Sequence, residues 1–387
     1  MRKTYLSQRV SQMKPSGIRK FFDIAATMKD VISLGIGEPD FDSPQPIIDA
    51  GIRSLKESQT HYTANRGILP LRSALSQKLE LLYGVTYDPE TEVVMTVGGS
   101  EALVVACMAI LDEGDEVILP TPCFVSYQGV IELAGGRPVE VPSRMENAFM
   151  PDPQELAKAI TPRTKAILIN FPGNPTGAVA NRETLMAIGK LAEEHDLVVI
   201  SDEIYDRLVY GVQHICFATL PGMRERTILI GGFSKDFAMT GWRIGFACAP
   251  RDILEGLARV HQYIIMTAPT MAQFGALEGL TCCDDFVEHM RQEYDRRRRL
   301  IVEGLNYIGL PTFEPLGAFY AFPQVSVTGL DDETFADRLL HENRVAVVPG
   351  SAFGPGGEGF VRCSYATAFD QLEEALDRID QFVKGLR

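Results

Sequence analysis

The stretches Lys-Ala-Ile-Leu-Ile-Asn at residues 165–170 and Leu-Val-Val-Ile-Ser at residues 197–201 decide the class of fold. Both are apolar almost throughout and do not alternate with polar residues, which is typical of strands covered on both faces. Between them, Asn181 can cap a helix whose apolar face begins at Leu185. The order strand, helix, strand predicts an α/β fold with a mostly parallel sheet between two helix layers.

Short apolar runs on either side extend this pattern. The expected further strands are Glu92–Val97, Glu116–Leu119, Thr227–Ile230 and Ile244–Cys248. After the first of them, Gly98 and Gly99 lead into a helix that we expect to end near Leu111. The central part of the chain is therefore predicted to form a large three-layer αβα domain.

The C-terminal part has a different pattern, which favours a smaller α+β domain. A long charged helix is expected from about residue 285. It is followed by expected strands near Ala318–Phe322, Val345–Val348 and Gly359–Tyr365, and by a final helix at Asp370–Leu386. The first residues have no place in the central sheet and are expected to pack with the C-terminal part or reach a partner.

The domain boundary is placed at Ser43-Pro44-Gln45-Pro46, because proline-rich segments commonly separate structural units. Residues 46–284 are predicted to form the large domain. Residues 1–45 together with 285–387 are predicted to form the small domain.

Composition excludes several classes of function. The chain has 387 residues, a net charge of −14 and 45% hydrophobic residues, as expected of a globular protein that is a poor binder of nucleic acid. No apolar run reaches the roughly 18–20 residues that span a bilayer. Met1–Val10 is polar and basic without an apolar core, so we expect no membrane association and a cytoplasmic location.

Cysteines and basic residues suggest no further chemistry. The seven cysteines are scattered and form no CxxC pair, so we expect reduced core residues and no metal site. The basic run Arg296–Arg299 lies beside Glu293 and Asp295 and is interpreted as a solvated helix face.

The segment Gly232-Phe-Ser-Lys-Asp-Phe-Ala-Met-Thr-Gly-Trp-Arg243 places a lysine in apolar surroundings. Burying an ammonium group is costly, and a deprotonated Lys235 could instead form a Schiff base with an aldehyde. Ser234 and Arg243 could hold a phosphate nearby. The alternative is a lysine that reaches the surface.

The same segment, from Ser234 to Arg243, resembles the pyridoxal-phosphate (PLP) lysine signature of class I aminotransferases, which have fold type I. The resemblance extends from Ser16 to the C-terminal helix and is strongest to the prokaryotic aspartate and aromatic branch. It implies an aminotransferase that moves an amino group between an L-amino acid, such as aspartate or an aromatic one, and a 2-oxo acid such as 2-oxoglutarate. It also implies a homodimer with shared active sites.

Three further residues around Lys235 match the family's chemistry. Asp202 ends the Leu-Val-Val-Ile-Ser strand, where a carboxylate faces the ligand crevice and can keep the PLP ring protonated. The alternative for Asp202 is a helix N-cap. The resemblance implies that Asn174 and Tyr205 contact the phenolic oxygen, and that Lys235, Asp202 and Tyr205 are the catalytic residues.

The remaining cofactor contacts are also implied by the resemblance. The turn that begins at Gly98 would bind the phosphate through Ser100 and the amides of Glu101 and Ala102, together with Ser234 and Arg243. Phe124 would stack on the ring, and Tyr62 would reach the phosphate from the other subunit. The free amides and the dipole at a helix N-terminus favour an anion. The alternative is that Gly98 and Gly99 form an ordinary tight turn without a ligand.

Substrate contacts are predicted at Arg362, Asn174 and Gly37. Arg362 lies on an expected strand, and its planar guanidinium can bind a carboxylate with two hydrogen bonds. The resemblance makes this the substrate's α-carboxylate, whereas the alternative is an internal salt bridge. Pro15–Lys20 would line the side-chain end of the pocket, where Arg19 and Lys20 are interpreted as surface charges rather than contacts to an acidic substrate.

Two other functions stay open at this point. One is a PLP-dependent C–S β-lyase, which Met239–Arg243 disfavours. The other is a PLP-binding transcription regulator, which would need a DNA-binding extension and suits this acidic chain poorly.

Overall fold

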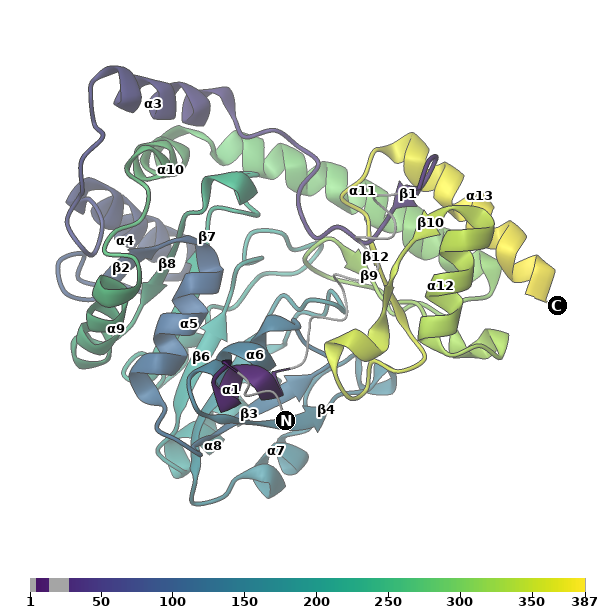
Figure 1. Cartoon of the computed structure of the whole chain (residues 1–387), viewed down its shortest axis with the longest axis horizontal. Coiled ribbons are helices and arrows are strands. Elements are labelled where there is room, and N and C mark those ends of the chain that lie inside the picture. Colours follow the sequence, from purple (N-terminus) through teal and green to yellow (C-terminus); the bar gives the residue numbers. More distant parts are fainter. Residues whose placement is uncertain (1–4, 14–27, 387) are drawn as a thin grey trace.

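The computed structural model describes residues 5–13 and 28–386. At its centre lies a seven-stranded sheet (Figure 1). In spatial order its strands are β2 (Val93–Thr96), β8 (Gly245–Cys248), β7 (Thr227–Gly232), β6 (Val198–Asp202), β5 (Thr164–Asn170), β3 (Glu116–Thr121) and β4 (Arg137–Pro142). Neighbouring strands are parallel except that β8 runs antiparallel to β2 and β7. The prediction of a mostly parallel sheet is confirmed.

One strand departs from the parallel pattern and another was not expected, each for a physical reason. β8 is reversed because the connection from β7, residues 233–244, contains no crossover helix and closes a hairpin. This connection carries Lys235. β4 was not predicted, since Pro138 and Pro142 disguise it, and it pairs only with β3 at the edge of the sheet, where proline is tolerated.

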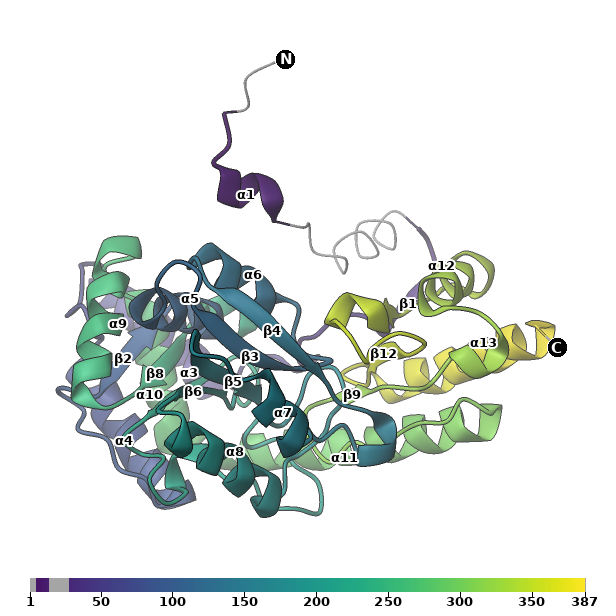
Figure 2. The same ribbon diagram turned by 90° about the horizontal axis from the view of Figure 1, so that it is seen from below.

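Helices cover both faces of the sheet (Figure 2). On one face lie α5 (Gly98–Ile110), α6 (Ser126–Leu133) and α9 (Arg251–Ile264). On the other lie α3 (Gln45–Lys56), α4 (Leu69–Tyr83), α7 (Pro153–Ala159), α8 (Arg182–Glu194) and α10 (Thr270–Cys282). Ile200 of β6 packs in the core with α5, while Val199 packs in the core with α8. Burial on both faces explains why this strand is apolar throughout.

The C-terminal part has its own core and smaller sheets. β11 (Val348–Pro349), β12 (Val361–Ser364) and β9 (Tyr320–Ala321) form an antiparallel sheet, and β1 (Ile32–Ser33) pairs in parallel with β10 (Val345–Ala346). The accompanying helices are α11 (Asp284–Ile308), α12 (Asp332–Asn343) and α13 (Phe369–Leu386). The expected strands near Ala318–Phe322 and Gly359–Tyr365 are present but shorter, whereas the expected strand Val345–Val348 is divided between β10 and β11, which belong to different sheets. The N-terminal α1 (Gln8–Gln12) instead contacts α6, and Arg9 pairs with Glu113 at 3.0 Å.

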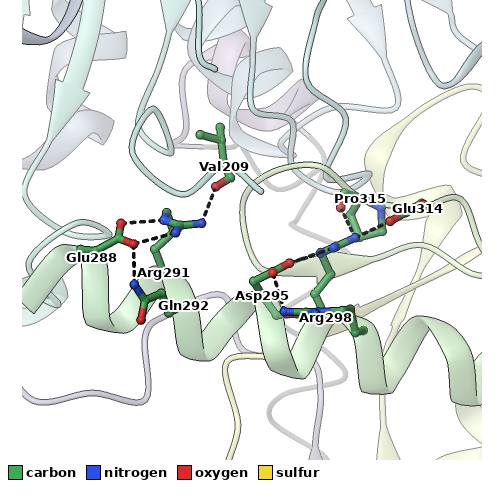
Figure 3. Close-up of polar contacts among 9 residues, drawn as sticks. Val209, Glu288, Arg291, Gln292, Asp295, Arg298, Glu314 and Pro315 are labelled. Carbon is green, nitrogen blue, oxygen red and sulfur yellow. Dashed lines mark hydrogen bonds and ion pairs between the residues drawn. The ribbon is translucent and has the colours of Figure 1, made fainter. Parts of the chain in front are cut away.

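Helix α11 connects the C-terminal part with loops that leave the central sheet (Figure 3). Arg291 donates to the carbonyl of Val209 at 3.3 Å, and Arg298 donates to Glu314 at 2.8 Å. The interpretation of Arg296–Arg299 as a solvated face is wrong for its middle two members, because Arg297 and Arg298 are each only 7% exposed. Each pairs with one acidic residue of α11 and with one from outside the helix, which is Asp40 for Arg297 and Glu314 for Arg298.

All seven cysteines are free, and six of them are buried, as predicted for reduced core residues. Within residues 5–13 and 28–386, no helix is long and apolar enough to cross a membrane.

Candidate active site

A cavity of about 360 Å³ lies at the carboxyl ends of β5, β6 and β7 and is closed on its far side by the C-terminal part. Ten of the predicted site residues line it: Gly37, Ser100, Phe124, Asn174, Asp202, Tyr205, Ser234, Lys235, Arg243 and Arg362. Ligands of open parallel sheets bind at this edge, so the fold brings the predicted residues to a suitable place.

Lys235 points into this cavity from the hairpin between β7 and β8. Its Nζ donates to the carbonyl oxygen of Gly37 at 2.6 Å and lies 5.8 Å from the centre of the Tyr205 ring. Burial, with the nearby Arg362 guanidinium, lowers the pKa of Lys235 to about 8. About a tenth of the amine is therefore unprotonated at pH 7, far more than for an ordinary lysine, and this fraction can act as a nucleophile. The alternative of a lysine that reaches the outer surface does not hold.

Asp202 is the last residue of β6 and is 5% exposed. The Tyr127 hydroxyl donates to its Oδ2 at 2.8 Å, and the Ile204 amide donates to its Oδ1 at 3.2 Å. Burial raises the pKa of Asp202 to about 6, and the hydrogen bond from Tyr127 opposes this shift. No α-helix begins at Asp202, so the N-cap alternative is wrong. The result is a buried anion suited to a cationic ring nitrogen.

Arg362 is 3% exposed and extends from β12 across the cavity. It donates to Asn174 Oδ1 at 2.8 Å and to the Gly35 carbonyl at 2.6 Å. Among the described residues, its Nε has no hydrogen-bond partner and no carboxylate pairs with its guanidinium. The alternative of an internal salt bridge is therefore contradicted within that part of the chain. A buried guanidinium without a counter-ion is suited to a ligand carboxylate.

Tyr205 and Tyr320 face each other beside this arginine. Their hydroxyl oxygens are 2.9 Å apart, and the Arg362 guanidinium lies 4.5 Å from the centre of the Tyr320 ring. Burial raises the pKa of both phenols. Both hydroxyls therefore keep their protons and can act as hydrogen-bond donors.

One end of the cavity is lined by Ser100 at the start of α5, together with Ser234 and Arg243. Gly98 has φ +73°, and a Cβ there would lie 2.8 Å from Arg243 Nη2. The backbone thus approaches the guanidinium as closely as a glycine allows. Free amides in the first turn of a helix, next to an arginine, favour a phosphate.

Three predicted residues do not line the cavity. The Glu101 carboxylate accepts from the Val97 amide and contacts His261 Nδ1 at 2.6 Å, and Ala102 is fully buried, so their side chains pack away from the site. Tyr62 is 80% exposed. The Pro15–Lys20 segment, including Arg19 and Lys20, lies outside the described residues.

Several lining residues were not predicted, among them Asn170, Tyr127 and Tyr320. Asn170 ends β5, and its amide donates to the Asp202 carbonyl at 2.8 Å. Its position at a strand end is the same signal that marks Asp202 and could have found it. The two tyrosines resemble core aromatics in the sequence, and only the fold brings their hydroxyls to the site.

Comparison with known proteins agrees with this geometry. Residues 29–379 match the family model for aminotransferases of class I and II. The chain belongs to this family. It is 51% identical over 380 residues to the putative aminotransferase YugH of Bacillus subtilis and 49% identical over 382 residues to an aspartate aminotransferase of Pyrococcus abyssi. Each alignment covers 98% of both chains.

A solved structure gives the same result for the fold. The aromatic aminotransferase from Pyrococcus horikoshii superposes with a TM-score of 0.91 at 47% identity, covering 95% of this chain and 99% of that chain. The protein is therefore an enzyme of fold type I, a PLP-dependent aminotransferase acting on an amino acid and a 2-oxo acid. These relatives favour transamination over the lyase and regulator alternatives.

The cavity fits the cofactor that the family implies. It contains a buried amine for an aldehyde, a buried carboxylate for a ring nitrogen and an anion site at the start of α5. Each group has the charge and burial that the corresponding part of PLP requires.

Proposed function

We propose that Lys235, Asp202 and Tyr205 are the catalytic residues of this aminotransferase. The supporting observation is that the Lys235 amine, the buried Asp202 and the buried Arg362 line one cavity. When bound, PLP supplies an electron-withdrawing ring that stabilises negative charge at the substrate's α-carbon. The unprotonated amine of Lys235 removes the proton from that carbon.

The other predicted residues hold the cofactor in place. Asp202 keeps the ring nitrogen protonated, while Asn174 and Tyr205 donate to the phenolic oxygen. Phe124 covers the ring face. Ser100, Ser234, Arg243 and the amides of Glu101 and Ala102 bind the phosphate. The burial of Asp202 excludes water that would weaken its interaction with a cation.

Arg362 binds the α-carboxylate of the amino acid and of the 2-oxo acid, with Asn174 and Gly37 beside it. The unpartnered Nε of Arg362 supports this role, because a second oxygen of a carboxylate could accept from it. We propose glutamate with 2-oxoglutarate as one pair. The names of the relatives favour aspartate or an aromatic amino acid as the other donor.

Adding single amino acids to the PLP-loaded protein tests this function. Glutamate, and aspartate or phenylalanine, should convert the bound cofactor's absorption band to that of the amine form and release the matching 2-oxo acid. Release of pyruvate and ammonia from a cysteine conjugate, without such conversion, would indicate the C–S β-lyase instead.

We propose that the enzyme is a homodimer in which Tyr62 reaches the phosphate of the partner's site. Tyr62 is 80% exposed and lies beside a second exposed segment that includes Tyr263, at 85%, and Met266, at 48%. Asn65 donates to the Met266 carbonyl at 2.9 Å and so joins the two segments. Exposed apolar patches of this kind mark interaction sites. Sedimentation at increasing protein concentration would test the assembly.

The domain division and the location also stay proposals. We propose a large domain of residues 46–284 and a small domain of residues 1–45 with 285–387, supported by the core of the C-terminal part and by the pairing of β1 with β10, whereas α1 contacts α6 of the large domain. Limited proteolysis would test the boundaries.

We also propose a cytoplasmic location. Seven free cysteines suit a reducing compartment such as the cytoplasm, and fractionation of cells that produce the protein would test this.

A further inference from the structure

We propose that Arg297 is a positioning residue for the substrate side of the active site. Its ion pair with Asp40 fixes the segment Gly35–Phe41, and the carbonyls of this segment orient Lys235 and Arg362. The inference rests on the proposed roles of those two residues. It assigns a role to part of the basic run in α11, which the transamination chemistry does not use.

The segment contacts both cations directly. The Gly35 carbonyl accepts from Arg362 Nη2, and the Gly37 carbonyl accepts from Lys235 Nζ, each at 2.6 Å. At Gly37 a Cβ would lie 2.6 Å from the Tyr320 hydroxyl oxygen, so the backbone packs closely against the site. A small displacement of this backbone would therefore move the acceptors of both functional cations.

Asp40 connects the segment to α11. Arg297 Nη1 donates to both carboxylate oxygens of Asp40, at 2.9 and 2.8 Å, and the Tyr294 hydroxyl donates to Oδ1 at 3.2 Å. The Arg297 side chain is 8% exposed and is also held by Glu293 Oε1 at 3.0 Å. The arginine is thus fixed in the helix before it contacts the loop, which limits the entropy lost on pairing.

Aromatic packing surrounds the same ion pair. The Phe41 ring packs edge-on against Tyr294 at 5.6 Å and against Phe286 at 6.1 Å, both from α11. The Arg297 guanidinium lies 5.5 Å from the centre of the Phe41 ring. This cluster covers the Arg297 half of the pair, whereas the Asp40 side chain stays 28% exposed, so solvent screens the pair in part.

The segment around residues 35–41 is fixed to the rest of the fold at both ends and at Asp40, and the position of Asp40 explains how loss of the ion pair would disturb the active site. Leu34 is fixed by backbone hydrogen bonds with Ala346 and Ser364, and Ser43 donates to the Ala238 carbonyl beside the Lys235 hairpin. Between these two ends, Asp40 supplies the attachment to α11. Only two residues separate it from Gly37, so a shift of Asp40 is passed on to the carbonyl that contacts Lys235.

The same helix provides a matched control. The Arg299 side chain is 62% exposed, and it donates to Asp295, one turn earlier in α11. Substitution of either arginine by glutamine removes the same charge from the same run. Only Arg297→Gln removes the contact with Asp40.

The test compares Arg297→Gln and Arg299→Gln as PLP-loaded enzymes. For Arg297→Gln we expect the KM for the amino donor to rise between about tenfold and about a hundredfold, with a smaller fall in kcat, of less than about tenfold, from the disturbed orientation of Lys235, and with PLP content unchanged. Amide hydrogen exchange in residues 35–41 should speed up at least about tenfold. Arg299→Gln should leave KM and exchange unchanged, and equal values for the two variants would overturn the proposal.

Asp40→Asn keeps the test decisive if Arg297→Gln does not fold. It should reproduce the KM increase, and the double variant should be no worse than either single one, since the two residues act as a pair. Additive losses would contradict this. If wild-type enzyme does not transaminate, the proposed function fails, but hydrogen exchange in residues 35–41 still decides the role of Arg297.

Discussion

The floor of the cavity comes from the central sheet, whereas the opposite wall comes from residues 35–41 and from β9 and β12. Floor residues lie at or just beyond strand ends: Asp202 ends β6, and Lys235 follows β7 closely. The wall depends on distant pairs, since Arg362 contacts Asn174 across 188 positions and Gly35 across 327. Changes in the floor should therefore affect the chemistry, and changes in the wall should affect binding.

The largest expected effect is in the floor. Lys235→Ala removes the proposed base, so turnover should fall more than about 10³-fold. The protein should keep its fold, which circular dichroism can check, because within residues 5–13 and 28–386 the removed amine donates only to the Gly37 carbonyl. Turnover close to that of the wild type would contradict the assignment.

A variant in the wall should instead weaken substrate binding and leave cofactor binding intact. Arg362→Gln removes the bidentate partner of the substrate's carboxylate, so KM should rise about a hundredfold. PLP content, measured by absorption, should stay unchanged, because Arg362 does not belong to the phosphate end. Loss of the cofactor with an unchanged KM would remove the distinction between floor and wall.

The pH dependence of cofactor capture gives a smaller effect. Burial lowers the pKa of Lys235 to about 8. Only the unprotonated amine attacks an aldehyde, so capture of PLP by the apoenzyme should speed up as the pH rises, by about tenfold between pH 7 and pH 9. Stopped-flow absorption would measure this rate. A rate that does not change over this range would mean that the amine is already unprotonated or does not take part.

The smallest effect is expected at Tyr127, which supports the floor. The hydrogen bond that the Tyr127 hydroxyl donates to Asp202 lowers the pKa of this carboxyl group, whereas burial raises it. Tyr127→Phe should therefore raise the pKa of Asp202 above about 6. Asp202 becomes protonated, and loses its negative charge, as the pH falls through this pKa. Activity at pH 7 should fall roughly twofold to fivefold, with little change at pH 9. An acid limb that does not move in the pH–rate profile would show that Asp202 does not control it.

Much of the floor could be predicted from the sequence. Asp202 follows from its place after an apolar strand, and Asn170 shows the same signal, although it was not used. Both residues line the cavity because the strand ends of a parallel sheet meet at one edge, whatever the details of packing.

The wall could be predicted only in part. Arg362 was found through its family resemblance, while Tyr320 lies in an apolar strand that gives no sign of its hydroxyl's partner. The prediction that Arg297 is solvated is wrong, because the sequence of a run of four arginines does not distinguish buried from exposed positions. Its burial depends on Asp40, which lies 257 positions earlier in the chain. Contacts at such separations follow from tertiary packing and leave no local pattern.

Chemical trapping of the cofactor tests the central claim most directly. The PLP-loaded enzyme would be reduced with borohydride, digested and mapped by mass spectrometry. The account predicts a stable pyridoxyl group on Lys235, in the peptide that joins β7 to β8, and none in Lys235→Ala. A label on another lysine, or no label on the loaded wild-type enzyme, would contradict it.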